Sequence, residues 1–302
     1  MQQRVPEWPL DERIVIGLVA AQFPELAGQR VARLGGGLDH ELFSVGEQWI
    51  LRFPRRADRV PWLRREIDIL ATVSETLGRM VPRFELIGEP SQAFGYPFVG
   101  YRRLPGVGAD QRPVGANLAS EIGALLTAVH RVDPRRIPPT PAGWEDEPWL
   151  ELRTALAAAA PAVDRVLGPS LRGLAAPYLA GLVPVPAQQG QRRFIHNDIC
   201  PEHVLVDQDL GSLTGLIDFT DAMVGDPVLD FVGLIGIGGY DFIARVVACY
   251  GLPVDEAFWS KLTWLARTLT LTWLADSVCE DQAAVPMHLA WVGRAFERAE
   301  RD

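Results

Sequence analysis

The sequence predicts an α+β fold in which a small, β-rich N-terminal lobe precedes a larger, mainly helical C-terminal lobe. Three observations indicate this arrangement. Short β-like stretches crowd into residues 30–105, apolar residues recur at helical spacing from residue 117 onward, and a β-hairpin rich in Asp and His interrupts the helical part at 194–231. With 302 residues, 48% of them hydrophobic, the chain can fill a substantial core. We expect the lobes to span residues 1–106 and 107–302.

The helices and strands of the N-terminal lobe are predicted from helix-capping residues, turn residues and β-like stretches. Asp11 is placed to cap a helix that ends near Phe23–Pro24. Two β-like stretches, ELFSV and QWILRF, are joined by Gly-Glu and preceded by a three-glycine turn at 35–37. Pro61 then opens a helix whose apolar residues fall near one face. A second β-like pair, FELIG and YPFVGYRRL, completes the predicted sheet.

The C-terminal lobe is predicted mainly from helical periodicity. Asn117 is placed to cap a helix with one buried face, and residues 258–278 form a long apolar helix. We expect irregular or linker-like chain in the Pro- and Ala-rich run 133–163 and again at 183–193. We expect Trp259, Trp264 and Trp273 to belong to the helix core.

Charge and composition narrow the possible partners. The formal net charge of −9 argues against nonspecific nucleic-acid binding, which depends on clustered Lys and Arg, and it is compatible with a cationic ligand. No stretch approaches the roughly 20 apolar residues of a membrane span, and the N-terminus lacks a basic segment followed by an apolar run. We therefore expect a cytoplasmic monomer that binds neither membrane nor nucleic acid.

The cysteines suggest neither a disulfide framework nor a zinc ribbon. Cys200, Cys249 and Cys279 form no CxxC pair and cannot all pair with one another. We expect three reduced thiols.

The segment from Phe194 to Phe231 carries the clearest chemistry. Two β-like pieces, HVLVD and LTGLIDF, flank a turn at Gly211, so the segment is predicted to be a hairpin with polar residues at its ends. We expect five side chains to converge there: His196, Asp198, His203, Asp218 and Asp221.

These residue types suit phosphoryl transfer. That reaction needs a carboxylate to orient the attacking hydroxyl and one or two Mg²⁺ ions to neutralise phosphate oxygens. Asp198 would orient the hydroxyl. Asp218, twenty positions later, would ligate Mg²⁺ at the end of the following strand, and His203 would be a second metal ligand.

The pattern HNDxxxxH followed by LIDFxDAxxGDPxxDF resembles the Brenner-type motif of aminoglycoside and macrolide phosphotransferases, which are related to protein kinases. The resemblance implies a protein-kinase-like bilobal fold, a catalytic Asp at Asp198 and a metal ligand at Asp218. The position of His203 is usually Asn in that family but is His in some of its antibiotic kinases. Imidazole is a softer ligand for Mg²⁺ than an amide oxygen.

The same resemblance covers roughly residues 30–235 and assigns the nucleotide site. A hairpin containing Gly35 and Gly36 would cover the phosphates of ATP or GTP. Arg52 stands where many relatives carry Lys and would pair with those phosphates, and the helix residue Glu66 would hold that cation. Backbone groups near Tyr101 would meet the purine.

The acceptor is expected to be a small molecule, and a cationic antibiotic fits the acidic chain best. This favours an aminoglycoside and a role in resistance. Asp221, three residues past Asp218, faces the expected approach of the acceptor, and Asp276 and Glu280 could bind amines by charge-assisted hydrogen bonds or simply be solvated. The segment LIGIGGYDF at 234–242 is nearly uncharged where aminoglycoside relatives commonly carry carboxylates. A macrolide or another hydroxylated metabolite therefore competes as the acceptor.

Other interpretations of these residues stay open. Asp198 alone could be an ordinary loop residue and Asp218 an ordinary turn residue, and it is their spacing that favours a site. His196 is expected to fix its loop by hydrogen bonds, and Asp226 and Asp230 to cap or brace the loop after the hairpin. A non-catalytic pseudokinase-like module would not require the base, and a nucleic-acid binder would need a basic aromatic face.

Overall fold

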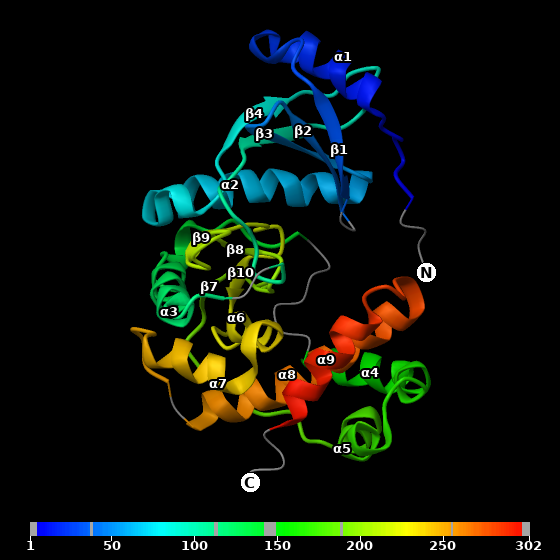
Figure 1. The fold of residues 1–302 in the computed structure, drawn as a ribbon, viewed down its shortest axis with the longest axis vertical. Helices are drawn as coiled ribbons and strands as arrows, with labels where there is room; N and C mark the ends of the chain where they lie inside the picture. Colours follow the sequence, from blue (N-terminus) through cyan, green and yellow to red (C-terminus); the bar gives the residue numbers. More distant parts are fainter. Residues whose placement is uncertain are drawn as a thin grey trace. The chain divides into compact units, whose positions relative to one another are not determined.

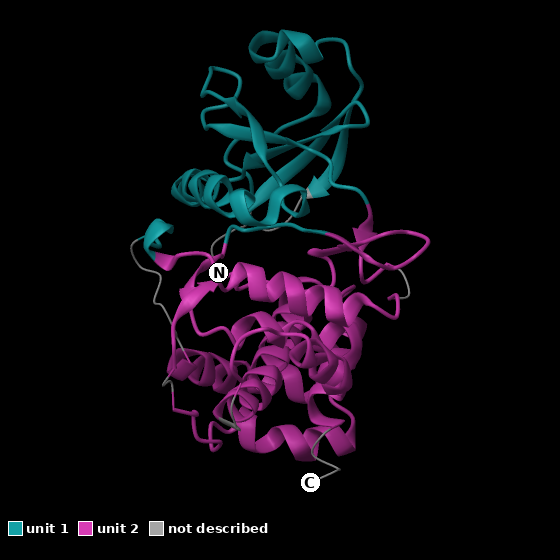
Figure 2. Ribbon diagram, turned by 90° about the vertical axis from the view of Figure 1, so that its left-hand side faces the viewer, with its two compact units in different colours: residues 1–105, 135–143, 215–220 teal, residues 106–134, 144–214, 221–302 magenta. Residues whose placement is uncertain are grey.

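The computed structural model describes residues 5–36, 39–111, 114–141, 149–187, 190–254 and 256–297 (Figure 1). The chain forms two compact units (Figure 2). Unit 1 comprises residues 1–105, 135–143 and 215–220, and unit 2 comprises residues 106–134, 144–214 and 221–302. The short segment that ends the hairpin, 215–220, thus packs with the N-terminal unit.

Unit 1 is built on a five-stranded antiparallel sheet of order β1-β2-β3-β5-β4. Its strands are β1 (Val31–Gly36), β2 (His40–Val45), β3 (Trp49–Pro54), β4 (Phe84–Gly88) and β5 (Phe98–Arg102). Every residue of the central strand β3 is buried, so both faces of the sheet are covered there. The β-like stretches predicted from the sequence are confirmed.

Two helices cover opposite sides of this sheet (Figures 1 and 2). Helix α1 (Glu12–Gln22) begins where predicted, because Oδ1 of Asp11 accepts a 2.8 Å hydrogen bond from the N–H of Ile14. One face of α1 packs on an aromatic core in which the Phe53 and Phe98 rings stack at 4.5 Å between centroids. Short 3₁₀ turns follow at η1 (Pro24–Leu26), η2 (Ala57–Arg59) and η3 (Gly78–Met80).

Helix α2 (Val60–Leu77) carries Pro61 in its first turn, as predicted. Its buried face includes Leu63, Leu70 and Val73, and it also includes Glu66. A carboxylate on the apolar face of a helix must find a partner, because an unpaired buried charge is very costly. The packing of α2 therefore aims Glu66 at the sheet.

In unit 2, helix α3 (Leu118–Val129) has the predicted buried face, but the predicted cap is wrong. Asn117 lies in the helical region of backbone conformation (φ −89°, ψ −8°), and its side chain makes no capping hydrogen bond. A capping residue normally needs an extended backbone to turn its side chain onto the first free N–H groups. Here the hydroxyl of Ser120 donates to the Asn117 carbonyl instead.

The prediction of irregular chain through 133–163 is also wrong for most of its second half. After the 3₁₀ turn η4 (Pro134–Arg136), residues 149–164 form helix α4 (Trp149–Asp164), with Pro161 inside it. Alanine has the highest helix propensity of any residue type, and the alanine run in α4 outweighs one proline near the end of the helix. Residues 142–148 lie outside the described part. Helix α5 (Pro169–Leu179) follows, and no helix or strand occurs in the described residues of 183–192.

The predicted hairpin is confirmed, with shorter strands than its sequence pattern indicates. Strands β6 (Val107–Gly108), β8 (Val204–Val206) and β9 (Leu213–Leu216) form one sheet, and β7 (Arg193–Ile195) pairs antiparallel with β10 (Met223–Gly225). Gly211 has a positive φ of 62° in the turn, where a left-handed conformation favours glycine. The N–H groups of Asp209 and Leu210 both donate to Asp207 Oδ1, which tightens the turn.

Helices complete unit 2: α6 (Leu229–Val232), α7 (Ile235–Ala248), α8 (Glu256–Glu280) and α9 (Val285–Phe296). The long helix predicted at 258–278 is confirmed as α8, which packs against α4 and α9. Helix α7 is broken at Gly238 and Gly239, whose backbone angles are not helical. Within the described residues, no helix combines the length and apolar character that crossing a membrane requires.

Candidate active site

A buried ion pair lies at the centre of unit 1. Strand β3 presents Arg52 and helix α2 presents Glu66, and Nη1 of the arginine donates to Oε1 of the glutamate at 2.8 Å. The two side chains are 6% and 0% exposed. The structure thus brings together the cation and the helix carboxylate that the sequence suggested as partners.

The same arginine reaches the end of the hairpin. Nη2 of Arg52 donates to Oδ1 of Asp218 at 3.1 Å and to the hydroxyl of Thr220 at 3.0 Å. Glu66 in turn accepts from the N–H of Phe219 and from the Thr220 hydroxyl. Asp218 has a positive φ of 66°, a strained conformation for a residue other than glycine. This turn is therefore held from two sides by the Arg52–Glu66 pair.

Burial changes the protonation behaviour of this cluster. Burial raises the pKa of Glu66 to about 7, and the positive charge of Arg52 opposes that rise. Burial alone would lower the pKa of Arg52, but the charges of Glu66 and Asp218 outweigh it, so that the pKa lies above its usual value. Burial, together with the charge of Arg52, lowers the pKa of His40 to about 3. His40 is thus neutral, and its Nδ1 accepts from Arg52 Nη2 at 3.2 Å.

The other residues suggested for the nucleotide site lie on the same sheet. Gly35 and Gly36 end strand β1, and Gly35 has a positive φ of 113°. Residues 37 and 38 lie outside the described part. Tyr101 is buried on β5 opposite Ile50 of β3, and burial raises the pKa of its phenol to about 12. The Tyr101 side chain therefore belongs to the core of unit 1.

In unit 2, a pinned loop presents Asp198. Its side chain is 43% exposed. The preceding N–H groups of His196 and Asn197 donate to the fully buried Asp230 at 2.9 and 2.6 Å. Asn197 has a positive φ of 66°, which turns the chain so that the next side chain faces outward. Asp230 therefore braces the loop that precedes the hairpin, whereas the sequence suggested that it would cap or brace the loop that follows it.

The hydrogen bonds of Asp230 continue further into the core of unit 2. Oδ2 of Asp230 is 2.9 Å from Nε2 of His130, whose Nδ1 is 2.6 Å from the Tyr250 hydroxyl. Both His130 and Asp230 are buried. A fully hydrogen-bonded polar network of this kind fixes one arrangement, because any group left unpaired would pay its desolvation cost. His196 is itself buried, and its Nδ1 accepts from the N–H of Asp198 at 3.3 Å.

His203 and Cys200 lie beside Asp198. Nδ1 of His203 donates to the backbone carbonyl of Asp198 at 2.8 Å and lies 3.3 Å from its carboxylate. The Cys200 thiol donates to the Glu202 carboxylate at 3.2 Å. Burial first, and then the negative charges of Asp198 and Glu202, raise the pKa of this thiol far above its usual range.

The carboxylates expected to meet the acceptor are Asp221, Asp276 and Glu280. Asp221 is partly exposed, and its backbone carbonyl accepts from Nδ2 of Asn197 at 3.3 Å. Asp276 and Glu280 are exposed in the last turns of α8. The structure therefore joins Asp221 to the Asp198 loop through the backbone and leaves Asp276 and Glu280 facing solvent.

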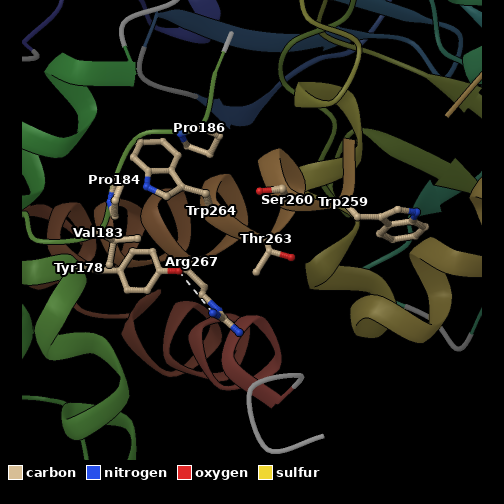
Figure 3. Close-up of a pocket in the computed structure, with 9 residues that line it drawn as sticks. All are labelled: Tyr178, Val183, Pro184, Pro186, Trp259, Ser260, Thr263, Trp264 and Arg267. Carbon is tan, nitrogen blue, oxygen red and sulfur yellow. Dashed lines mark hydrogen bonds between the residues drawn. The ribbon is translucent and has the colours of Figure 1, made fainter. Parts of the chain in front are cut away.

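A separate cavity of about 360 Å³ opens beside α8 (Figure 3). Tyr178, Pro184 and Trp264 lie on one side of it and Trp259 on the other, and Arg267 donates to the Tyr178 hydroxyl at 3.3 Å. None of the residues suggested from the sequence as catalytic or binding lines this cavity. Trp264 is buried, as predicted for helix core, whereas Trp259 is partly exposed.

A family model covers most of this chain. The model of the phosphotransferase enzyme family matches residues 30–286. The chain belongs to this family. The resemblance inferred from the hairpin motif is thereby confirmed.

Relatives and solved structures of similar fold extend this finding. The uncharacterized protein YcbJ of Bacillus subtilis (strain 168) is 26% identical over 292 residues, covering 91% of this chain and 88% of that protein. The GDP complex of an aminoglycoside 2'-phosphotransferase-IIIa has a TM-score of 0.72 at 23% identity, over 97% of this chain and 100% of that one. The macrolide 2'-phosphotransferase MphH from Brachybacterium faecium has a TM-score of 0.63 at 21% identity, over 92% and 97%. This chain therefore has their kinase-like α+β fold, as predicted.

Sequence reasoning missed three contributors to the geometry of this family member's site. Thr220 follows Asp218 by two residues in the motif, so its place beside Glu66 could have been suspected from the sequence. His40 reaches Arg52 because His40 and Pro54 are opposite each other in neighbouring strands, a pairing that only the register reveals. The sequence predicts Cys200 only as a reduced thiol, and the structure places it within the Asp198 loop.

Proposed function

We propose that this protein is an O-phosphotransferase that moves the γ-phosphate of ATP or GTP onto a hydroxyl of a small molecule. The observation that carries the proposal is the Asp198 carboxylate, partly exposed at the end of a loop whose backbone is tied to buried Asp230. A carboxylate held in place but open to solvent suits the orientation of an incoming hydroxyl. A binding module would have no need for it.

In the proposed reaction Asp198 accepts the hydrogen bond of the acceptor hydroxyl. The hydroxyl oxygen forms a bond to the γ-phosphorus as the bond between that phosphorus and the β–γ bridging oxygen breaks. The hydroxyl proton passes to the Asp198 carboxylate, and ADP or GDP leaves. His203 contributes by donating from Nδ1 to the Asp198 carbonyl, which limits the motion of the loop.

Unit 1 is proposed to receive the nucleotide. Arg52, held by Glu66, supplies the positive charge for the phosphates, and Gly35 and Gly36 belong to the hairpin that would cover them. Backbone groups beside Tyr101 would meet the purine. The lobes of such a kinase would be residues 1–106 and 107–302, with the acceptor on the second lobe.

Of the two residues suggested as Mg²⁺ ligands, Asp218 fits that ion better than His203 does. The carboxylate of Asp218 is 37% exposed and is a hard oxygen ligand of the kind Mg²⁺ prefers, whereas His203 offers a softer nitrogen. We therefore propose Asp218 as the principal ligand and His203 as a secondary one. The bound ion would neutralise phosphate oxygens.

We favour an aminoglycoside as the acceptor, which would give the enzyme a role in resistance. The net charge of −9 favours a cationic ligand, and the aminoglycoside phosphotransferase named above has a similar fold. Asp221, Asp276 and Glu280 are the carboxylates proposed to meet its amines. The enzyme would act in the cytoplasm, where nucleotide donors are abundant.

A macrolide is the second candidate. The start of helix α7 is uncharged and is broken at Gly238–Gly239, where a polyamine ligand would be expected to find carboxylates. One structure of similar fold is a macrolide phosphotransferase.

The proposal is tested by nucleotide turnover in the presence of Mg²⁺. ATP and GTP are each offered with a panel of aminoglycosides, macrolides and small amino alcohols, and product phosphorylation is followed by mass spectrometry. Asp198→Asn is expected to lower kcat about 10²–10⁴-fold with nearly unchanged nucleotide affinity. The matched control Asp209→Asn changes an exposed carboxylate in the hairpin turn and should behave like wild type. Full activity of Asp198→Asn would overturn the assignment of the base.

A further inference from the structure

One loop of unit 2 gathers oxygen, sulfur and nitrogen donors at a single point. A carboxylate oxygen of Asp198, the Sγ of Cys200 and a ring nitrogen of His203 all lie within 4.8 Å of one another. Each of these side chains is partly exposed, so an ion from solution can reach them. The three residues span only six positions of the chain.

This donor set does not match the preference of Mg²⁺, which takes oxygen ligands almost exclusively. Thiolate, imidazole and carboxylate together are the ligands that Zn²⁺ selects. We propose that Asp198, Cys200 and His203 form a site for a thiophilic divalent cation, with Zn²⁺ as the best-fitting ion, and that Zn²⁺ bound there blocks phosphoryl transfer.

Hydrogen bonds already hold the loop from Asn197 to His203 in the arrangement that this metal site would use. The N–H of His203 donates to the Cys200 carbonyl at 3.1 Å, and Nδ1 of His203 donates to the Asp198 carbonyl at 2.8 Å. Because Nδ1 is the donor to this carbonyl, the metal ion would be bound through Nε2. A metal-binding histidine commonly uses one ring nitrogen for the metal and the other for a carbonyl or carboxylate. Asp230 fixes the N-terminal side of the loop by accepting from Asn197.

The cluster is distinctive within this chain. Among the described residues, no other three His, Cys, Asp or Glu side chains bring ligand atoms so close together. The other two thiols are exposed in unit 2, Cys249 directly after α7 and Cys279 on α8. Three protein ligands leave the fourth tetrahedral position of Zn²⁺ open to water or to a phosphate oxygen.

Binding would remove the carboxylate that the reaction uses. The Cys200 thiol would release its proton to solvent as the Zn–S bond forms, and the lone pair of Asp198 that accepts the substrate proton would be donated to the metal. This inhibitory consequence rests on the proposed function. The binding itself does not.

Cobalt spectroscopy tests the binding without any assay of activity. Co²⁺ is titrated into the full chain in buffer free of Mg²⁺. We expect a thiolate-to-cobalt charge-transfer band and visible bands of tetrahedral Co²⁺ that saturate at one equivalent and disappear when Zn²⁺ is added. Cys200→Ser should lose the charge-transfer band, and the matched control Cys249→Ser should keep it. A wild type without the band, or a Cys200→Ser variant that retains it, overturns the proposal.

Inhibition is tested separately in buffers that fix the free Zn²⁺ concentration at constant excess Mg²⁺-nucleotide. Loss of a ligand should raise the Zn²⁺ concentration for half-inhibition at least about 10–100-fold in Cys200→Ser, with Cys249→Ser unchanged. If Cys200→Ser is inhibited like wild type, the inhibitory role is wrong even where the cobalt band depends on Cys200. If no acceptor is phosphorylated, the proposed function fails, whereas the cobalt result still decides the site.

Discussion

In unit 1 the Arg52 and Glu66 side chains are 6% and 0% exposed, whereas in unit 2 the Asp198 side chain is 43% exposed. The buried pair neutralises its own charges, and its hydrogen bonds also hold the turn at Asp218. The Asp198 loop instead buries its brace, Asp230, and leaves the carboxylate in contact with solvent. In unit 1 the charges are paired and buried, whereas in unit 2 a buried residue holds the loop, and the carboxylate stays partly exposed beside Nδ1 of His203.

This comparison predicts that the two regions respond differently to loss of a carboxylate. Changes in unit 1 should first appear as lost stability, because they remove a partner of a buried charge. Changes at Asp198 should first appear as lost turnover. The following variants test this difference, from the largest expected effect on stability near neutral pH to the smallest.

Glu66→Ala should have the largest effect. It removes the fully buried partner of Arg52 and should lower the free energy of unfolding by about 3–5 kcal/mol, measured by urea denaturation. The double variant Arg52→Met/Glu66→Leu should recover much of that loss while remaining inactive, because well-packed apolar groups replace the pair without supplying its charge. A loss below about 1 kcal/mol in Glu66→Ala would show that the pair is not the main support of this core.

Asp230→Asn should have the second-largest effect on stability. The change places an amide NH₂ group among donors, since Asp230 accepts from the N–H groups of His196 and Asn197 and contacts His130. An unsatisfied buried donor costs about 1–3 kcal/mol, so unfolding should be easier by that amount. Turnover should also fall, because the Asp198 loop loses its anchor. Wild-type kcat in this variant would contradict the role of the brace, and Asp209→Asn again serves as the control.

His40→Gln should alter the pH dependence of stability. The pKa of His40 is lowered to about 3 in the folded chain, against 6.5 for the free group, so between these values the unfolded chain binds more protons. Stability must therefore fall as the pH falls through this window, by up to about 1.4 kcal/mol per pH unit. His40→Gln lacks this contribution, so its unfolding free energy should decline less steeply than that of wild type below pH 6.5. Parallel curves for the two proteins from pH 6.5 to 4 would contradict a buried, neutral His40.

Glu75→Gln should have the smallest effect. Glu75 and Arg136 form two 2.8 Å hydrogen bonds, but their side chains are 59% and 49% exposed. Exposed pairs contribute little and are screened by salt, so the urea midpoint should hardly move, and any shift should vanish in high salt. A shift comparable to that of Glu66→Ala would remove the distinction between buried and exposed pairs on which the comparison rests.

Several parts of the fold could be predicted because their signals are local. Asp11 precedes an apolar helical pattern by one turn, and it does cap that helix. The strands around Arg52 and the turn at Gly211 likewise follow from neighbouring residues. The prediction failed at Asn117 because a capping residue type does not guarantee an extended backbone. It failed at α4 because prolines near the run obscured the helix propensity of its alanines.

The sequence by itself determined the spacing of Asp198 and Asp218, the hairpin between them and the family to which that pattern belongs. These features are spacings along the chain and short periodic patterns, which can be identified directly in the amino-acid sequence. Only the tertiary structure decided that Arg52 also contacts Asp218 and Thr220, and that Cys200 lies beside Asp198 and His203. The reason is physical: left-handed turns at Asn197 and Asp218, and hydrogen bonds to residues far along the chain, set which side chains meet.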